Sequence, residues 1–304
     1  MDSNALHYLI RTKCTTALRS TLHWKRFGIG CLPWLLLALP DAARAQWVDD
    51  FDTINPAWVT DRYEPAAFQS APFLGDNRLQ ITVDQTGSTA NRPPAYSSSF
   101  FNTQGRQRPG EILGDWSLSA EVYVPSSANT TTGQLMRTDL WVHTGTMVSN
   151  GAYAVIGFTN ASPLTPLDPT APDRSFRFQV FDGTASEPDH WVDVGVPSGF
   201  TFDTWHTLEA SDTGIAFEYR LDGVVVFSDP TGLGANLQTA FIEAYNFGQT
   251  GTGLDSYSVY WDHAVAAVPE PAMAALALGI ATLSLYVLRR CNGWGSGKLK
   301  PPQG

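Results

Sequence analysis

The segment 205–227, WHTLEASDTGIAFEYRLDGVVVF, decides the fold class of this chain. It contains three short runs rich in β-branched and aromatic residues, separated by the turn signals Asp212-Thr-Gly214 and Asp222-Gly223. An Asp-Gly pair between two such runs is the strongest short-range indication of a β-hairpin, because both central residues of that turn need a positive φ. The segment therefore predicts consecutive antiparallel strands.

The rest of the central chain follows the same pattern. Apolar and polar residues alternate with period two in 78–84 and in 116–124, which indicates strands with one buried face. No stretch shows an apolar stripe of helical period. About a dozen such runs predict an all-β protein with two stacked antiparallel sheets. Further predicted strands are 153–158, 175–181, 241–245 and 257–265.

Several motifs resemble concanavalin-like, laminin-G-like jelly rolls. The opening Trp47-Val-Asp-Asp-Phe51 and the run Gly75-Asp-Asn-Arg-Leu-Gln-Ile81 are similar to the first strands of that family, and Tyr257-Ser-Val-Tyr-Trp-Asp262 is similar to its last strand. The run Trp205-His-Thr-Leu, followed by the Asp222-Gly223 hairpin, also fits the family pattern. The resemblance implies one jelly-roll domain over 46–267, in which the first and last strands pair.

The N-terminal segment 1–45 has the features of a secretory signal peptide. Basic residues precede the apolar stretch 27–39, and Ala43-Arg-Ala45 follows with a small residue at each end. The apolar stretch is shorter than the roughly 20 residues that a membrane span needs. We therefore expect an exported protein; an uncleaved N-terminal anchor is the alternative.

Near the C-terminus, a Val-Pro-Glu-Pro sequence precedes seventeen uncharged residues, 272–288, and then two arginines. This length reaches the lower limit for a transmembrane helix. The arginines predict that its end lies on the cytoplasmic side. A plain single-span anchor fits these features. The residues that flank the apolar segment are Pro269, Glu270, Pro271, Arg289 and Arg290.

The order of these three parts closely resembles the PEP-CTERM sorting signal of Gram-negative bacteria, over residues 268–290. In that family, an exosortase recognises the Pro-Glu-Pro tripeptide and is thought to cleave there. The resemblance implies an exosortase partner, a membrane anchor before processing, and a final location at the cell surface or in the extracellular matrix. Residues 291–304 would form a short cytoplasmic tail, which is longer than such signals usually carry.

The charge balance excludes some partners. The chain has 19 Lys and Arg against 29 Asp and Glu, and residues 46–268 alone hold nine Arg, no Lys and twenty-six Asp and Glu, a formal charge of −17. Such a surface argues against nucleic acid as a partner. The three cysteines, Cys14, Cys31 and Cys291, lie outside this segment, so a disulfide cannot stabilise it. Stability has to come from the core.

The sequence gives only a weak indication of catalysis. Laminarinase-type glycosidases of similar fold carry E-x-D-x-x-E or E-x-D-x-x-x-E on one strand, and the nearest match is Glu187-Pro-Asp-His-Trp-Val-Asp193. The closing Glu is missing, and Pro188 disfavours a central strand. Polysaccharide lyases need His, Tyr, Arg and Gln side chains that converge in space, which a sequence does not place. We therefore predict no catalytic residues and a protein that is not an enzyme.

Two kinds of binding site are candidates. Trp141 and His143 alternate on one predicted strand, and with Trp191 they could stack on sugar rings, whose faces are apolar. The alternative is that the tryptophans fill the core, as is expected for Trp205 with His206 facing outward. The jelly-roll resemblance also implies a structural Ca²⁺ where the first and last strands meet, with Asp262, Gly75 and Asp50 as ligands.

These observations together predict an exported, non-catalytic protein that is sorted to the bacterial envelope surface or to the extracellular polysaccharide matrix, where its jelly roll contacts glycans. One alternative is a divergent glycoside hydrolase or polysaccharide lyase of jelly-roll fold. Another is a purely structural matrix protein. A convergent pair of acidic groups on the concave side of the sandwich would favour the enzyme.

Overall fold

The computed structural model describes residues 45–90, 92–96, 102–145, 153–181, 190–230, 236–249, 251, 254–268 and 284. The chain divides into two compact units, Met1–Ala42 and Ala43–Gly304, and all described residues belong to the second. Nearly all of the predicted signal peptide, and all of the sorting residues Pro269, Glu270, Pro271, Arg289 and Arg290, lie outside the described residues. Within the described part of the chain, no helix is both long and apolar enough to cross a membrane.

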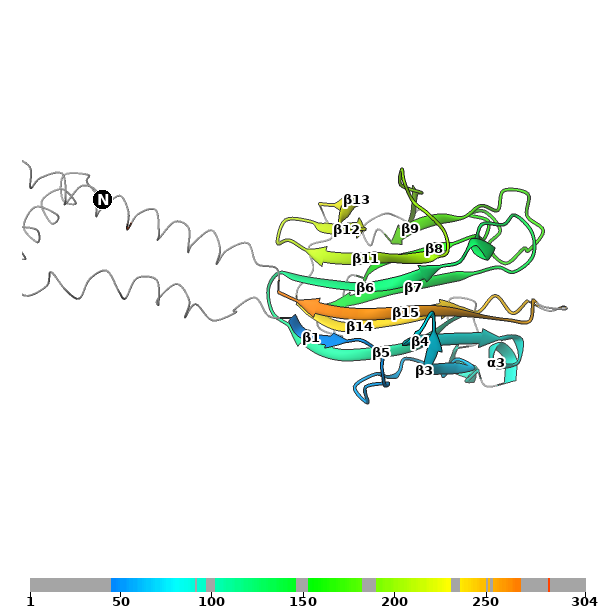
Figure 1. Ribbon diagram of the computed structural model, residues 1–304, viewed down its shortest axis with the longest axis horizontal. Helices are drawn as coiled ribbons and strands as arrows, with labels where there is room; N and C mark the ends of the chain where they lie inside the picture. Colours follow the sequence, from blue (N-terminus) through cyan, green and yellow to red (C-terminus); the bar gives the residue numbers. More distant parts are fainter. Residues whose placement is uncertain are drawn as a thin grey trace, which may run out of the picture. The chain divides into compact units, whose positions relative to one another are not determined.

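The first of two sheets, sheet A, has eight strands in the order β13-β12-β11-β6-β15-β4-β3, with β1 also paired to β15. In Figure 1 its long last strand, β15, runs beside β6. The strands are β1 (Ala45–Asp49), β3 (Ala67–Phe73), β4 (Asp76–Asp84), β6 (Trp116–Val124), β11 (Thr204–Asp212), β12 (Phe217–Leu221), β13 (Val224–Asp229) and β15 (Ser256–Ala267).

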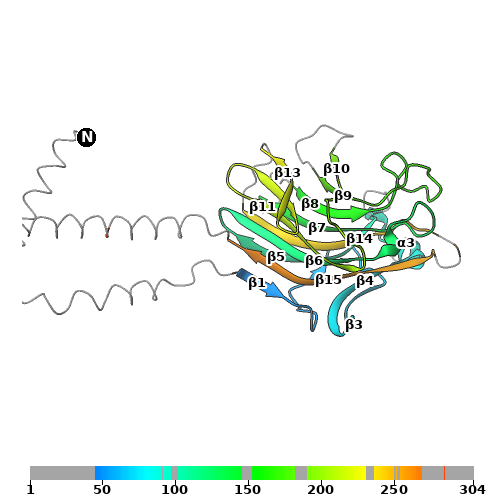
Figure 2. The ribbon, with the colours of Figure 1, turned by 45° about the horizontal axis from the view of Figure 1, so that its top comes forward.

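Sheet B has seven strands in the order β10-β9-β8-β7-β14-β5-β2, and Figure 2 shows it stacked against sheet A. All strand pairs in both sheets are antiparallel. The strands are β2 (Val59–Thr60), β5 (Thr103–Ile112), β7 (Arg137–Thr144), β8 (Tyr153–Thr159), β9 (Arg177–Phe181), β10 (Trp191–Gly195) and β14 (Leu237–Tyr245); the short helices are α3 (Gln85–Ala90), η2 (Pro94–Tyr96) and η4 (Ser126–Ala128).

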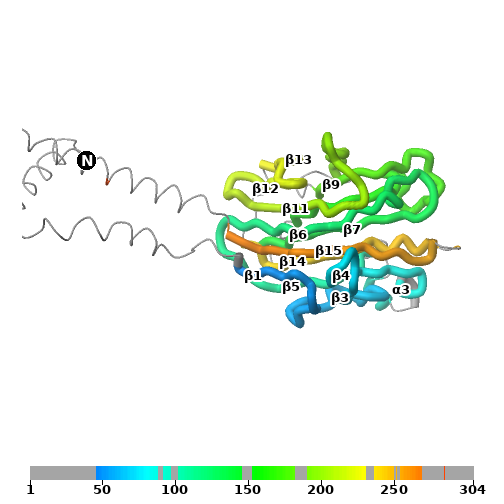
Figure 3. The backbone as a smooth tube through the Cα atoms, viewed as in Figure 1, coloured from blue at the N-terminus to red at the C-terminus, as the bar shows by residue number. Residues whose placement is uncertain are grey.

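The predicted all-β sandwich of two antiparallel sheets is confirmed. Asp222 and Gly223 connect β12 to β13 with φ values of 51° and 77°, as the Asp-Gly hairpin requires. The first and last described strands also pair, with Asp49 opposite Ala264, and Figure 3 shows β1 and β15 side by side. The resemblance to concanavalin-like jelly rolls implies this pairing.

One core fills the space between the sheets. Every second residue of β6, from Trp116 to Val124, is buried and faces sheet B, while the residues between are half-buried on the other side. Leu140, Val142 and Ile242 project from sheet B into the same core. Burial of each such side chain stabilises the fold by about 1.5–3 kcal/mol. Because this domain has no cysteine, its stability comes from this packing and not from a disulfide.

Strand β11 corrects one expectation. Trp205 was expected in the core with His206 outside, but Trp205 is half-buried on the outer face of sheet A and His206 is buried. Leu208 and Ala210 face the core, and a period of two then turns His206 inward as well. The two ring nitrogens of His206 hydrogen-bond the Asp222 carboxylate and the Thr201 carbonyl at 2.8 Å each, which satisfies a polar ring in the core.

Buried hydrogen bonds connect the two sheets at their centre. Trp261 of β15 donates its Nε1–H to the Thr138 hydroxyl of β7 at 2.9 Å, and this hydroxyl donates to the Glu243 carbonyl of β14 at 2.7 Å. The buried Tyr257 hydroxyl donates to the Arg137 carbonyl at 3.0 Å. These bonds fix β7 and β14 against β15, because a slip of one residue would leave all of them unpaired in a dry interior.

Candidate functional site

The outer face of sheet B, the face that points away from sheet A, carries its side chains in rows. Inward residues such as Leu140, Ile156 and Ile242 belong to the core, so the residues between them point outward. The strand registers align these outward residues across the sheet. We call two of the rows the aromatic row (Gln107, Phe241, Trp141, Val155, Phe181 and Trp191) and the acidic row (Gly105, Glu243, Asp139, Gly157, Gln179 and Asp193).

Two carboxyl groups lie next to each other in the acidic row. Glu243 of β14 is directly opposite Asp139 of β7, and both side chains are fully buried. Residues in such opposed positions have their Cβ atoms about 4.5–5.5 Å apart. Two buried acidic groups at this separation disfavour each other's ionisation, which is the usual arrangement of carboxyl pairs in active sites.

Arginines cover both carboxyls from the solvent side. Arg62, in the loop that follows β2, donates from Nη2 to both Glu243 carboxylate oxygens at 2.8 Å, and its Nε contacts Asp61. Arg137 donates from Nε to Asp139 Oδ2 at 2.7 Å. The two arginine side chains are 13% and 15% exposed. The two guanidinium groups therefore lie between the buried carboxyls and the solvent.

A glycine makes room for this pair. A Cβ atom at Gly157 of β8 would lie 2.2 Å from Asp139 Oδ1 and 2.2 Å from the Thr138 carbonyl oxygen. No real Cβ contact is so short, so only glycine lets the Asp139 carboxyl lie across the neighbouring strand. The position of Gly157 in the acidic row is thus explained by the carboxyl beside it.

Burial raises the pKa of both acids. The pKa of Glu243 rises to about 8, because desolvation and the nearby Asp61 outweigh the Arg62 guanidinium, which lowers it. Desolvation also raises the pKa of Asp139, against the lowering by Arg137. Desolvation and Asp61 therefore favour the protonated form of Glu243, the form that a general acid needs, against the Arg62 guanidinium.

Two donors lie beside the Asp139 carboxyl. Trp141 Nε1 and Gln179 Nε2 are buried and lower the pKa of Asp139, although neither has a hydrogen bond of normal geometry to a described residue. Together with Arg137, these donors favour the ionised form of Asp139 against the desolvation that raises its pKa.

A second group of titratable side chains lies two residues further along the strands. His143 and Tyr153 are opposite each other on β7 and β8, with ring centroids 4.9 Å apart. Burial lowers the pKa of His143, and burial with the nearby Asp61 raises the pKa of Tyr153. Both groups are therefore neutral near pH 7, and Tyr153 is 40% exposed.

The structure brings the predicted glycan-binding residues onto this face. Trp141 and Trp191 belong to the aromatic row, and His143 lies two residues beyond Trp141 on the same strand. The Arg137 guanidinium lies 4.1 Å from the Trp191 ring centroid, above the strands between them. The site prediction for these three residues stays a prediction, but their common location agrees with a platform for a ligand.

Sequence reasoning missed the central part of the site. Glu243 is one acidic residue in a strand, and nothing within that strand indicates which residue of another strand will oppose it. Asp139 is in phase with Trp141 and His143, which was the only available signal. Of the earlier acidic candidates, Glu187 and Asp189 lie outside the described residues, and Asp193 pairs with Arg177 at 2.7 Å.

The structure shows the surroundings of the predicted calcium ligands. Asp262 Oδ2 lies 3.1 Å from Arg78 Nε, so a guanidinium lies beside this carboxylate. Gly75 is in the exposed turn between β3 and β4, and Asp50 is exposed after β1. Among the described residues, there is no group of three or more His, Cys, Asp or Glu side chains that could hold a metal ion. The calcium site at Asp262, Gly75 and Asp50 stays a prediction.

No family model matches the sequence, and no curated protein does. Similar solved structures include a laminarinase catalytic domain from Thermotoga petrophila (11% identity, 75% of this chain, 99% of that chain, TM-score 0.49). Another is the laminarinase catalytic domain of Thermotoga maritima (10% identity, 75% and 99%, TM-score 0.48). A third is a GH16 protein of the Bacteroides ovatus mixed linkage glucan PUL in complex with a G4G4G3G product (15% identity, 73% and 98%, TM-score 0.48).

These comparisons correct one prediction. The chain was predicted not to be an enzyme, whereas the solved structures that it resembles include glucanases and laminarinases. At identities of 8–15%, the similarity concerns the fold. Any activity has to come from the side chains that this chain itself places on sheet B.

Proposed function

We propose that the chain is a carbohydrate-active enzyme that hydrolyses glycosidic bonds on the outer face of sheet B. The observation that supports this proposal is the Glu243–Asp139 pair: two buried carboxyls at opposed positions of neighbouring strands, next to a row of aromatic side chains. Glycoside hydrolysis needs two such groups, one to protonate the leaving oxygen and one to act as nucleophile or base.

The environments of the two groups suggest their roles. Glu243, with a pKa of about 8, keeps its proton at neutral pH and is the general acid. Asp139, held by Arg137 at 2.7 Å, is the second carboxyl, whose negative charge the guanidinium favours. Directly opposed positions favour the short separation of about 5–5.5 Å found in retaining enzymes. The proposal requires that a substrate displace Arg62, which contacts both Glu243 oxygens, so that the glycosidic oxygen can reach this carboxyl.

The aromatic row supplies a surface for the sugar chain. Trp141 and Trp191 are half-buried, so each offers part of a ring to a ligand. Sugar rings stack their apolar faces on such side chains, while their hydroxyls reach donors and acceptors at the edges. Gln179 and Trp141, whose side-chain N–H groups lie beside Asp139, would hydrogen-bond those hydroxyls.

The test is turnover of a panel of soluble polysaccharides by the full-length chain. New reducing ends are the expected product. Glu243→Gln and Asp139→Asn should each lower kcat at least about 100-fold, because a general acid or nucleophile contributes at least that factor. Asp193→Asn is the matched control, since it removes a carboxylate from the same row that pairs with Arg177. Turnover that survives in both central variants would refute the roles of Glu243 and Asp139.

A polysaccharide lyase is the second candidate, and His143 with Tyr153 is the observation that favours it. A neutral His could remove a proton next to a uronate carboxylate, and a neutral Tyr could protonate the leaving oxygen, with Arg62 nearby. Lyases create unsaturated, ultraviolet-absorbing chain ends, which hydrolases do not. Such ends, abolished by His143→Ala or Tyr153→Phe, would assign the lyase reaction in place of hydrolysis.

We further propose that the chain is exported and sorted by its terminal segments. The residues that would carry sorting are Pro269, Glu270, Pro271, Arg289 and Arg290. In cells with an exosortase, the wild-type chain should leave the membrane fraction, and a chain with Ala at 269–271 should stay in it. Equal distribution of the two chains would contradict this proposal. Polysaccharide of the extracellular matrix is the partner that such a location would offer to sheet B.

A further inference from the structure

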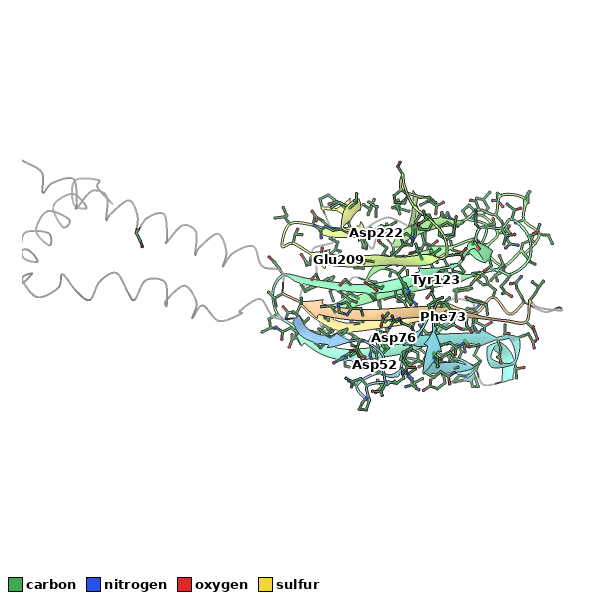
Figure 4. All side chains as sticks on the ribbon, in the orientation of Figure 1. Asp52, Phe73, Asp76, Tyr123, Glu209 and Asp222 are labelled. Atoms are coloured by element: carbon green, nitrogen blue, oxygen red, sulfur yellow. The ribbon has the colours of Figure 1, made fainter. Side chains whose placement is uncertain are left out.

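A hairpin from one edge of sheet A folds across its outer face. Strands β3 and β4 are joined by a two-residue turn at Leu74 and Gly75, with φ values of 53° and 92°. Phe73, the last residue of β3, stacks on Tyr260 of β15 with ring centroids 3.8 Å apart and contacts Tyr123 of β6 at 4.9 Å. Figure 4 labels Phe73 and Tyr123 on this face. The hairpin therefore places the Phe73 ring over β15 and β6, although β3 pairs with neither of these strands.

A gap opens beside this ring because β15 and β6 stop pairing. Their pairing covers Trp261 to Ala267, while β15 pairs with β4 from Ser256 onward. Strand β6 continues to Val124 beside β11, and the chain then forms η4. Residues 258–260 of β15 therefore do not pair with β6, and a cavity of about 150 Å³ lies there.

The lining of this cavity, here called the hairpin pocket, has three kinds of surface. Its floor is apolar, from the buried Met136 and Val259. Its wall is aromatic, from Phe73, Tyr260 and Tyr123. Its rim is polar and comprises the hydroxyls of Ser127 and Ser258, with Pro125 between Tyr123 and η4.

Hydrogen-bonding groups surround the aromatic wall. Gln80 Nε2 donates to the Tyr260 hydroxyl at 3.3 Å and to the Ser258 hydroxyl at 3.2 Å. The Asp203 carboxylate accepts the Ser126 N–H at 2.8 Å and lies beside the Tyr123 hydroxyl. The pocket therefore combines ring faces with both donors and acceptors at its edge, and it is too small for a polymer segment of more than one ring.

We propose that the hairpin pocket binds a single sugar ring, such as the end of a glycan chain or one unit of a polysaccharide. A pyranose has one apolar face for the side of the aromatic wall that the Phe73–Tyr260 stack leaves uncovered, and a ring of hydroxyls for Ser127 and Ser258. The site is on the opposite sheet from the Glu243–Asp139 pair and does not depend on the reaction proposed there. It would hold the chain on a glycan while the outer face of sheet B acts on it.

The experiment uses saturation-transfer NMR on the full-length chain with methyl glycosides of glucose, galactose and mannose. At least one glycoside should receive saturation from the protein. Ser127→Trp fills the rim from an exposed position and should abolish this transfer, whereas Ser228→Trp, an exposed serine on β13, should not. Equal melting temperatures of the two variants show that both fold.

Phe73→Leu keeps apolar volume and removes the ring, so the Kd should rise about 3- to 10-fold, the usual value of an aromatic face. Ser127→Trp and Ser228→Trp are compared in a chain that also carries Trp141→Ala, so that the aromatic row of sheet B does not contribute to the transfer. Transfer that persists in Ser127→Trp in this background would overturn the proposal, because the sugar would then bind elsewhere. The absence of transfer to every glycoside would overturn it as well. Hydrolysis lost in Glu243→Gln but kept in Ser127→Trp separates this site from the proposed active site.

Discussion

The outer faces of the two sheets are built from the same alternating pattern and differ in how their charges are solvated. On sheet A, Arg220 pairs with Glu209 and Glu218 while all three side chains are 26% exposed. On sheet B, Glu243 and Asp139 are fully buried and pair with Arg62 and Arg137. An alternating strand therefore does not by itself mean a solvated outer face. What covers that face decides whether its charges are ordinary surface groups or candidates for chemistry.

The largest expected effect is on stability, and it is measured by removing one partner of an ion pair, first on sheet B and then on sheet A. Arg137→Ala leaves the buried Asp139 without its partner and should lower the free energy of unfolding by about 3–5 kcal/mol at pH 7. Arg220→Ala on sheet A should cost about 0–1 kcal/mol, because exposed pairs contribute little. Urea unfolding of both variants measures the difference. The loss in Arg137→Ala should shrink at low pH, where Asp139 takes up a proton; similar losses in the two variants would remove the contrast between the faces.

The pH dependence of stability should follow Glu243. Its pKa is 4.5 in the unfolded chain and about 8 when folded, so the folded state holds the proton more tightly between these values. The free energy of unfolding should therefore fall as pH rises from about 4.5 to 8, by up to about 1.4 kcal/mol per pH unit. The free energy of unfolding of Glu243→Gln should not show this decrease with pH, whereas that of Glu209→Gln on sheet A should show it. Denaturation at pH 5, 6.5 and 8 gives the slopes, and parallel curves for wild type and Glu243→Gln would refute the raised pKa.

The space for the carboxyl pair can be removed directly. Gly157→Ala puts a methyl group on Asp139 Oδ1 and the Thr138 carbonyl, and should cost about 1–3 kcal/mol. Gly110→Ala on β5 is the matched control, because nothing lies within 4 Å of its added Cβ, and it should change stability by less than about 0.5 kcal/mol. Thermal unfolding distinguishes the two. Equal melting temperatures would mean that the Asp139 carboxyl does not need this close approach.

The smallest expected effect is on polysaccharide binding, and it is tested with one tryptophan from each face. Trp141→Ala should weaken retention on a polysaccharide column or gel about fivefold, because a stacked aromatic side chain contributes about 1 kcal/mol. Trp205→Ala on sheet A should leave the contribution of sheet B to retention unchanged, and any loss that it causes would come from the hairpin pocket, because its ring contacts Phe73 and Tyr123. Affinity electrophoresis in polysaccharide-containing gels measures both. Retention that is unchanged in Trp141→Ala would contradict a polysaccharide surface on sheet B.

The sequence by itself determined the fold class and much of its detail. Period-two alternation marks β6 and β4 because a half-buried strand repeats every two residues, and Asp222-Gly223 marks its hairpin because that turn needs two positive φ values. The pairing of the first and last strands followed from the jelly-roll resemblance. These features depend on residues close together in the chain or on a known family pattern.

Only the tertiary structure decided the site. Glu243 and Asp139 are 104 positions apart, and their opposition depends on the register of β14 against β7, which long-range packing and the Trp261–Thr138–Glu243 hydrogen bonds set. Burial of the pair depends on Arg62, which comes from the loop that follows β2. Charge, exposure and pKa are properties of such assembled surroundings, so a pattern along one strand could indicate Trp141 and His143 but not the acids beside them.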